Sequence, residues 1–245
     1  MTTPATVLDV LTTDNPHQPR LTCYDDARGE RIELSGAVLA NWAAKAANAL
    51  QEEFDVEPGS VVALDLPTGH WRTAYWAVAV WAVGATLSLD VHEGADVLVT
   101  TAPTSDAADD SDEVVAVTLP ALARTWQGED LPTGVLDEAA EISGFGDDFS
   151  PWYDSSAEDP ALVRAGDRWT MAEAVPTVEP GRVLLAVADP AEHLRTLVGL
   201  WAAGGSAVTV ITPEGTLPTG LTPDPLPARL VQEGVTRVVE TPPGQ

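Results

Sequence analysis

Apolar residues recur along this chain at two spacings, and each spacing predicts a different kind of element. Apolar and polar positions alternate on both sides of a turn over residues 20–36, which predicts a hairpin of two strands. Residues 36–54 are rich in alanine and place their larger apolar side chains on one helical face, and Ser35 is a suitable N-cap. A short helix is also expected at residues 7–11.

Residues 61–90 follow the order strand, helix, strand. A short apolar strand, VVALDL, is broken by a proline and a glycine, and a helix is expected from about Trp71 to Val83. This helix is apolar on every face, and a helix of that kind is usually covered on all sides. Gly84 ends it and the strand ATLSLD follows, so the unit predicts two parallel strands joined by a right-handed crossover.

Residues 182–211 repeat this order of elements. In both units a strand is followed by a proline, two residues, a histidine, one residue and Arg-Thr, before an apolar helix, a glycine and a strand. The matching positions are Pro67, His70, Arg72 and Thr73 in the first unit and Pro190, His193, Arg195 and Thr196 in the second. The chain is therefore expected to be an α/β protein, with parallel or mixed sheets flanked by helices and two pseudo-repeated β-α-β units.

Composition along the chain indicates how these units are organised. Residues 126–160 are rich in Gly, Pro and Asp, and we interpret them as a connection between a first α/β lobe, residues 1–125, and a second, residues 161–245. One compact domain overall is the alternative. The acidic stretch at residues 102–112 lacks the glycine and the ligand spacing of an EF-hand, so a solvated loop is favoured over a calcium site.

Four aromatic side chains stand close together in the first unit, namely Trp71, Tyr75, Trp76 and Trp81. Two interpretations are open, a ligand cage and the interior of the fold. The second unit keeps one tryptophan, Trp201, and has aliphatic residues at the other positions. Aromatic residues that can be exchanged for aliphatic ones act as volume fillers, so core packing is favoured.

The charge of the chain excludes some partners. There are 38 acidic and 12 basic residues, a formal net charge of −26, which repels nucleic acid and anionic membranes. No apolar run approaches the length of a membrane span, and no signal sequence opens the chain, so a cytoplasmic protein is expected. The single cysteine, Cys23, excludes an internal disulfide and has acidic neighbours that raise its pKa, so it is not expected to be a nucleophile.

Residues 6–51 and 55–90 together resemble the start of the AMP-binding acyl- and aryl-adenylate-forming enzymes. This superfamily includes acyl-CoA synthetases, peptide-synthetase adenylation domains and luciferases. The likeness lies in the opening helix, the hairpin, the helix of small residues and a Pro-Gly-Asp-x-Val-Ala turn, in which Ser60 replaces the aspartate. Residues 184–211 and 230–244 are similar to the family's Pro-x-x-His helix, Gly-Gly strand and Val-Thr strand. The chain most resembles a short actinobacterial group related to this superfamily, which implies the fold of its N-terminal part.

The resemblance also shows what this sequence lacks. The family carries a phosphate loop rich in Thr, Ser and Gly and ending in Pro-Lys-Gly, whose backbone N–H groups wrap the phosphates. The corresponding residues, 158–182, contain neither a run of small residues nor a lysine, and Ala165-Gly166-Asp167 is expected to be a turn. The sequence ends where the family continues with its ribose-binding aspartate and its catalytic lysine. Because Lys45, the only lysine, lies in the early helix, adenylation by this chain alone is not expected, and no cofactor is expected.

His193 matches a histidine at a helix start that lies near the acyl pocket in the family. With Asp189, Arg195, Gly204 and Gly205 it forms the candidate ligand-binding set that the resemblance implies. The alternative is a polar residue satisfied by the backbone at a helix start, and the histidine at the equivalent place in the first unit favours it. No catalytic residue and no metal site is assigned, because the sequence carries no Ser-His-Asp signature and no metal-spaced histidine pair.

Two functions of different classes remain open. The first is a non-catalytic relative that serves as a binding or regulatory module, whose apolar surface is covered by a homodimer contact or by a protein partner. The second is a small-molecule site for an acyl, aryl or nucleotide group near His193, at the carboxyl ends of the strands, or a subunit of an enzyme completed by another chain. The first is the preferred hypothesis.

Overall fold

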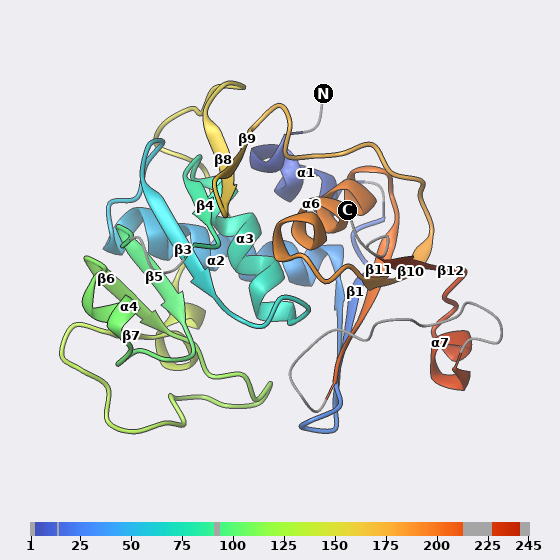
Figure 1. The fold of residues 1–245 in the computed structure, drawn as a ribbon, viewed down its shortest axis with the longest axis horizontal. Coiled ribbons are helices and arrows are strands. Elements are labelled where there is room, and N and C mark those ends of the chain that lie inside the picture. Colours follow the sequence, from blue (N-terminus) through green and yellow to red (C-terminus); the bar gives the residue numbers. More distant parts are fainter. Residues whose placement is uncertain (1–2, 14, 91–93, 213–226, 241–245) are drawn as a thin grey trace.

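Two β-sheets with helices packed between them form the protein (Figure 1). The computed structural model describes residues 3–13, 15–90, 94–212 and 227–240. Strands of both sheets are mostly parallel and flanked by helices, which confirms the expected fold class.

The five-stranded sheet has the order β12-β10-β11-β1-β2 within the described residues. Its strands are β1 (Pro19–Asp25), β2 (Glu30–Ser35), β10 (Arg182–Ala186), β11 (Ser206–Ile211) and β12 (Arg237–Glu240). β1 and β2 form the expected antiparallel hairpin, and the other neighbours are parallel.

The seven-stranded sheet has the order β7-β6-β5-β3-β4-β8-β9. Its strands are β3 (Val61–Asp65), β4 (Thr86–Ser88), β5 (Val97–Thr100), β6 (Glu113–Ala116), β7 (Leu136–Asp137), β8 (Pro160–Arg164) and β9 (Asp167–Thr170). Only the pair β8–β9 is antiparallel in this sheet, again over the residues that the structure describes.

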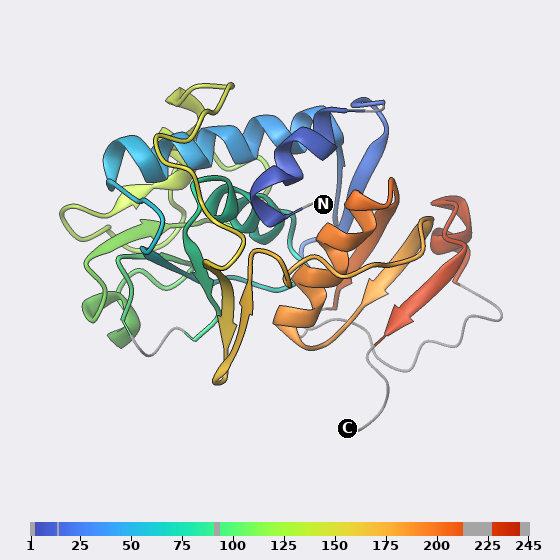
Figure 2. The same ribbon diagram turned by 90° about the horizontal axis from the view of Figure 1, so that it is seen from above.

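The longest helices lie between the two sheets, as Figures 1 and 2 show. The α-helices are α1 (Val7–Thr12), α2 (Gly36–Glu53), α3 (Trp71–Ala82), α4 (Asp106–Asp109), α5 (Glu138–Glu141), α6 (Pro190–Ala202) and α7 (Ala228–Gln232). Two 3-10 turns, η1 (Pro4–Thr6) and η2 (Ile142–Gly144), add to them. α2 begins where the sequence predicts, because the Ser35 hydroxyl accepts a hydrogen bond from the Val38 N–H at 3.3 Å.

Both predicted β-α-β units are present. The first is β3-α3-β4 and the second is β10-α6-β11, and each joins two parallel neighbouring strands. The two units lie in different sheets. The repeat in the sequence therefore corresponds to one helical crossover connection in each sheet.

The expected lobe boundaries do not coincide with the sheets. β1, from the first part of the chain, pairs in parallel with β11, with Leu21 opposite Ala207. β8 pairs in the other direction, with β4 of the first part, although residues 161–245 were assigned to a second lobe. The segment 126–160 also contributes β7 and α5 to the seven-stranded sheet region. Pairing between strands this far apart in sequence leaves no local pattern, because the residues of a strand do not specify which distant strand lies beside it.

The aromatic residues of α3 belong to the core, as the sequence analysis favoured. Every residue of α3 is buried, and Trp76 and Trp81 have no exposed surface. The helix packs on β3 and β4 of one sheet and on β1 of the other, which explains why it is apolar on all sides. The Trp81 indole N–H donates to the Ala161 carbonyl at 2.7 Å and thereby ties α3 to β8.

A buried charged cluster lies at the first turn of α3. The Arg72 guanidinium donates to both oxygens of Glu138, at 2.5 and 2.7 Å, and the Tyr75 hydroxyl donates to the same carboxylate. The side chain of Arg72 is 4% exposed and that of Glu138 is fully buried. Burial is the main cause that raises the pKa of Glu138, and Arg72 opposes it. This cluster fastens α5, from the segment read as a connection, to the central helix.

Replacing one partner of the buried pair is expected to destabilise the protein strongly. Glu138→Gln leaves the Arg72 guanidinium buried without a counter-charge, which should lower the free energy of unfolding by about 3–5 kcal/mol. Urea denaturation of the variant and the parent measures this difference. The matched control is Arg72→Met with Glu138→Gln, which removes both charges and should be less destabilised than Glu138→Gln alone. A double variant that is less stable than the single one would contradict the assignment.

Candidate functional site

The β8–β9 hairpin occupies the place where the resemblance puts a phosphate loop. Ala165 and Gly166 connect the two strands, with Arg164 opposite Asp167. Both connecting residues have positive φ, 51° and 86°, as a two-residue type I′ turn requires. The Ala165 N–H donates to both oxygens of the Asp90 carboxylate, at 2.9 and 2.8 Å. The expected turn is therefore present, and its first backbone donor is already bound by an anionic side chain.

Side chains fasten this hairpin to the start of α6. Arg164 of β8 forms an ion pair with Asp189. The Arg195 guanidinium lies over the Trp169 ring of β9, 4.9 Å from its centroid, and donates to the Glu173 carbonyl at 3.2 Å. The β8–β9 hairpin of the seven-stranded sheet is thereby joined to the first turns of α6, which belongs to the five-stranded sheet.

Asp189 and His193 make the contacts of residues that build a helix start. The Asp189 carboxylate caps α6 by accepting a hydrogen bond from the Glu192 N–H at 2.9 Å. His193 is 1% exposed, and its Nδ1 lies 3.3 Å from the Val187 carbonyl oxygen. Burial lowers the pKa of His193 to about 4, so the imidazole is neutral at pH 7.

The equivalent histidine of the first unit is also buried at a helix start, but there it is the N-cap itself, whereas Asp189 caps the helix of His193. His70 is buried and caps α3, with its Nδ1 accepting from the Arg72 N–H at 3.2 Å. Burial, with a smaller effect of Arg72, lowers the pKa of His70 to about 3. Two histidines that hold helix starts in two related units support the structural interpretation of His193.

Gly204 and Gly205 lie apart from the other three candidate residues. They follow α6 and precede β11, at the amino end of that strand. Asp189 and His193 instead follow the carboxyl end of β10, which is parallel to β11. The two groups therefore lie at opposite ends of the sheet, and the structure does not bring the five residues into one site. The predicted β-α-β order already implies this separation, because residues before and after a crossover helix lie at opposite ends of two parallel strands.

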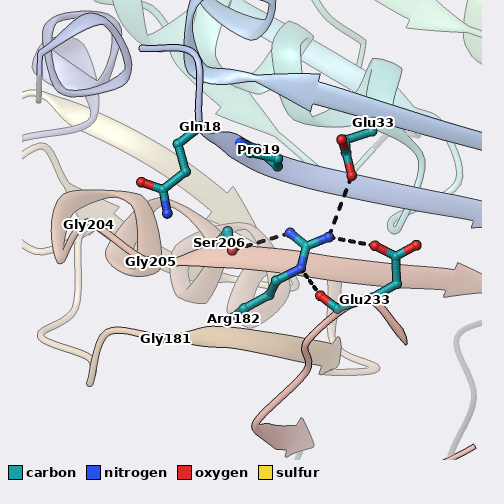
Figure 3. Close-up of a pocket in the computed structure, with 9 residues that line it drawn as sticks. All are labelled: Gln18, Pro19, Glu33, Gly181, Arg182, Gly204, Gly205, Ser206 and Glu233. Carbon is teal, nitrogen blue, oxygen red and sulfur yellow. Dashed lines mark hydrogen bonds and ion pairs between the residues drawn. The ribbon is translucent and has the colours of Figure 1, made fainter. Parts of the chain in front are cut away.

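The two glycines line a pocket of about 380 Å3 at the amino ends of β10 and β11 (Figure 3). Its lining residues are Gln18, Pro19, Glu33, Gly181, Arg182, Gly204, Gly205, Ser206 and Glu233. They come from four distant parts of the chain, so no local sequence motif predicts this pocket.

Charged groups inside this pocket bind one another. Arg182 donates from Nε to the Glu233 carbonyl at 2.5 Å and from Nη2 to the Glu233 carboxylate at 2.8 Å (Figure 3). Arg31 donates to the same carboxylate at 2.7 Å, and this bond is the main reason why the pKa of Glu233 falls to about 2. The network ties β10 and α7 to the β1–β2 hairpin, and its charges are matched within the protein.

Cys23 and the metal-binding residue types add no reactive centre in the described ranges. The Cys23 thiol is buried and donates to the Gly69 carbonyl at 3.4 Å, and burial raises its pKa to about 11. No group of three or more His, Cys, Asp or Glu residues is arranged to hold a metal ion in the part of the chain that the structure describes. In the same part, no helix is long and apolar enough to cross a membrane.

Solved structures with this fold include an acyl-CoA synthetase and an aryl-CoA ligase. A Brucella canis acyl-CoA synthetase superposes with a TM-score of 0.70 at 19% identity, over 98% of this chain and 47% of that chain. The anthranilate CoA ligase AuaEII, solved with anthranoyl-AMP, gives 0.63 at 15% identity, over 84% of this chain and 44% of that chain. This chain thus spans about half the length of the solved structures that it matches. At these identities the likeness shows the fold, which is that of the N-terminal domain of adenylate-forming enzymes.

Sequence comparison gives a relative of the same length. No family model matches the chain. A TIGR03089 family protein of Mycobacterium tuberculosis is 38% identical over 260 residues, which cover 98% of this chain and 100% of that protein. The chain belongs to the TIGR03089 family.

Proposed function

We propose that this protein is a non-catalytic member of the adenylate-forming fold that serves as a binding or regulatory module. The observation that carries the proposal is the two-residue β8–β9 turn. A phosphate loop acts through several free backbone N–H groups and a cation that meet the phosphates. In this turn the Ala165 N–H is bound by Asp90, and two residues cannot wrap a triphosphate.

The charges beside the turn also oppose adenylation. Transfer of a phosphoryl or nucleotidyl group needs positive charge at the phosphates, which metal ions and lysine or arginine supply. Here Asp90 and Asp167 lie at the turn and Arg164 is bound to Asp189, so the exposed Arg168 of β9 is the cation that faces these carboxylates. Lys45 cannot supply this positive charge. It lies on α2, and its amine donates to the Phe145 carbonyl at 2.6 Å.

The set around His193 gives less support to a retained small-molecule site. Its ionisable members are engaged as a helix cap, a buried neutral ring and an arginine stacked on Trp169. A second candidate, an enzyme completed by another chain, is favoured by one observation. This chain matches only 47% of the length of the Brucella canis acyl-CoA synthetase, and in this second candidate a partner chain supplies the remaining half.

The first test is calorimetric titration of the protein with Mg-ATP and, separately, with a non-hydrolysable acyl-adenylate analogue. Neither is expected to bind at micromolar concentration, because the two-residue turn offers no cradle of donors and the carboxylate of Asp90 already occupies its first N–H group. A full-length acyl-CoA synthetase titrated under the same conditions is the positive control. Micromolar binding of either ligand would refute the non-catalytic proposal.

The conformation of the turn can be tested through stability. Ala165 has φ 51°, which an alanine adopts with strain, whereas Asn-Gly is the preferred pair in a type I′ turn. Ala165→Asn is expected to raise the free energy of unfolding by about 0.5–1 kcal/mol, measured by urea denaturation. Ala157→Asn, at an exposed position without positive φ, is the matched control and should not stabilise. A destabilising Ala165→Asn would contradict the turn that carries the proposed function.

A further inference from the structure

One segment of this protein is held firmly although nearly all of it is exposed. Residues 143–153, here named the strap, begin with the last two residues of η2 and then run without helix or strand along the outside of α2 (Figure 2). Such segments are usually mobile unless side chains hold them. The contacts of the strap with α2 are therefore informative.

Polar side chains spaced three residues apart on α2 bind the backbone of the strap. Lys45 donates to the carbonyls of Ser143 and Phe145, at 3.2 and 2.6 Å, and forms an ion pair with Asp147. Asn48 donates to the carbonyls of Gly146 and Asp148, at 3.0 and 2.9 Å.

The last part of the strap is held by Gln51. Its amide donates to the Ser150 carbonyl at 3.3 Å and accepts from the Trp152 N–H at 2.8 Å. A spacing of three residues places these side chains on one side of the helix, so this side of α2 binds the backbone of the strap along its length. The single lysine of the protein is used for this purpose.

The strap ends in two exposed aromatic side chains. Trp152 is 58% exposed and Tyr153 is 56% exposed, whereas the tryptophans of α3 are buried. Adjacent aromatic side chains fixed at the surface are typical centres of protein interfaces, since they lose little conformational freedom on binding. The bond from the Trp152 N–H to Gln51 fixes the backbone from which the pair projects.

The charges around this aromatic pair define its partner. Exposed acidic residues, Asp147, Asp148 and Asp154, flank it in the sequence. No lysine or arginine occurs in residues 125–163, which include the strap. None occurs in residues 46–71 either, which include the second half of α2. Such a surface attracts cationic groups and repels a second copy of this chain.

We propose that Trp152 and Tyr153 dock an arginine-bearing segment of a partner protein. The guanidinium is planar and weakly hydrated, and it stacks on aromatic faces while its N–H groups reach neighbouring carboxylates. This gives the proposed binding role a surface and a partner chemistry. Its test measures peptide binding, whereas the test of the proposed function measures nucleotide binding, so the two can fail separately.

The test uses a fluorescein-labelled peptide of alternating arginine and glycine, with fluorescence anisotropy as the readout at physiological salt. Trp152→Ala with Tyr153→Ala keeps the net charge and is expected to weaken binding about tenfold. The matched control is Leu122→Ala with Val231→Ala, which removes side chains that are 91% and 60% exposed elsewhere. This control should change affinity by less than about twofold.

A lysine–glycine peptide of equal charge separates stacking from simple attraction. It is expected to bind the parent protein more weakly than the arginine peptide, and to bind the Trp152→Ala, Tyr153→Ala variant as weakly as the arginine peptide does. If removing both aromatic rings leaves the affinity for the arginine peptide unchanged, or if that peptide does not bind the parent, the proposal is overturned. Equal binding of both peptides to the parent also overturns it.

The role of Lys45 gives a second measurement that leaves the aromatic pair intact. Lys45→Met keeps the length of the side chain but removes its bonds to the strap, so hydrogen exchange of residues 143–153 should become faster and arginine-peptide binding weaker. Faster exchange with unchanged affinity would show that the strap is not pre-organised for binding and would overturn that part of the proposal.

Discussion

The complete burial of α3 is the constraint on which the rest of this structure depends. A helix that is apolar on every face needs cover on every face, and one sheet can supply only one side. The seven-stranded sheet covers α3 through β3 and β4, and the five-stranded sheet reaches it through β1. α2 covers a further side, and the pair formed by Arg72 and Glu138 satisfies the charges that this arrangement buries. Two sheets around shared helices therefore follow from the composition of one helix.

The interlocked sheets also determine what happens at the candidate site. Because β8 joins the sheet of β4 while α6 belongs to the other sheet, the β8–β9 hairpin lies beside the start of α6. In an enzyme of this fold the region could stay open for a ligand. Here the short turn lets Arg164 reach Asp189 and lets Trp169 pack against Arg195, so contacts between side chains occupy the space. The short β8–β9 turn thus joins the two sheets through side-chain contacts at this edge.

Local patterns in the sequence predicted the helices and strands, whereas the order of strands in each sheet depends on pairing between residues far apart in the sequence. The Ser35 cap, the β1–β2 hairpin and both β-α-β units could be predicted, because each depends on residues that are close in sequence. The pairing of β1 with β11 could not, since the residues of a strand do not specify which distant strand lies beside it. The same limit applies to the candidate site. The turn at Ala165 could be predicted locally, whereas the pocket residue Arg182 meets Glu233 only after folding.

The scarcity of positive charge links the turn, the core and the strap. The chain has 12 basic residues against 38 acidic ones. Because cations are few, each one that is bound within the fold reduces the number that could bind a phosphate. Arg72 is bound in the core, Arg164 holds the hairpin to α6, and Lys45 holds the strap. These three cations therefore hold parts of the fold together, while many carboxylates lie at the surface. A protein organised in this way is poorly suited to bind nucleotides and well suited to attract a basic partner, which is why the closed turn and the exposed aromatic pair fit a single interpretation.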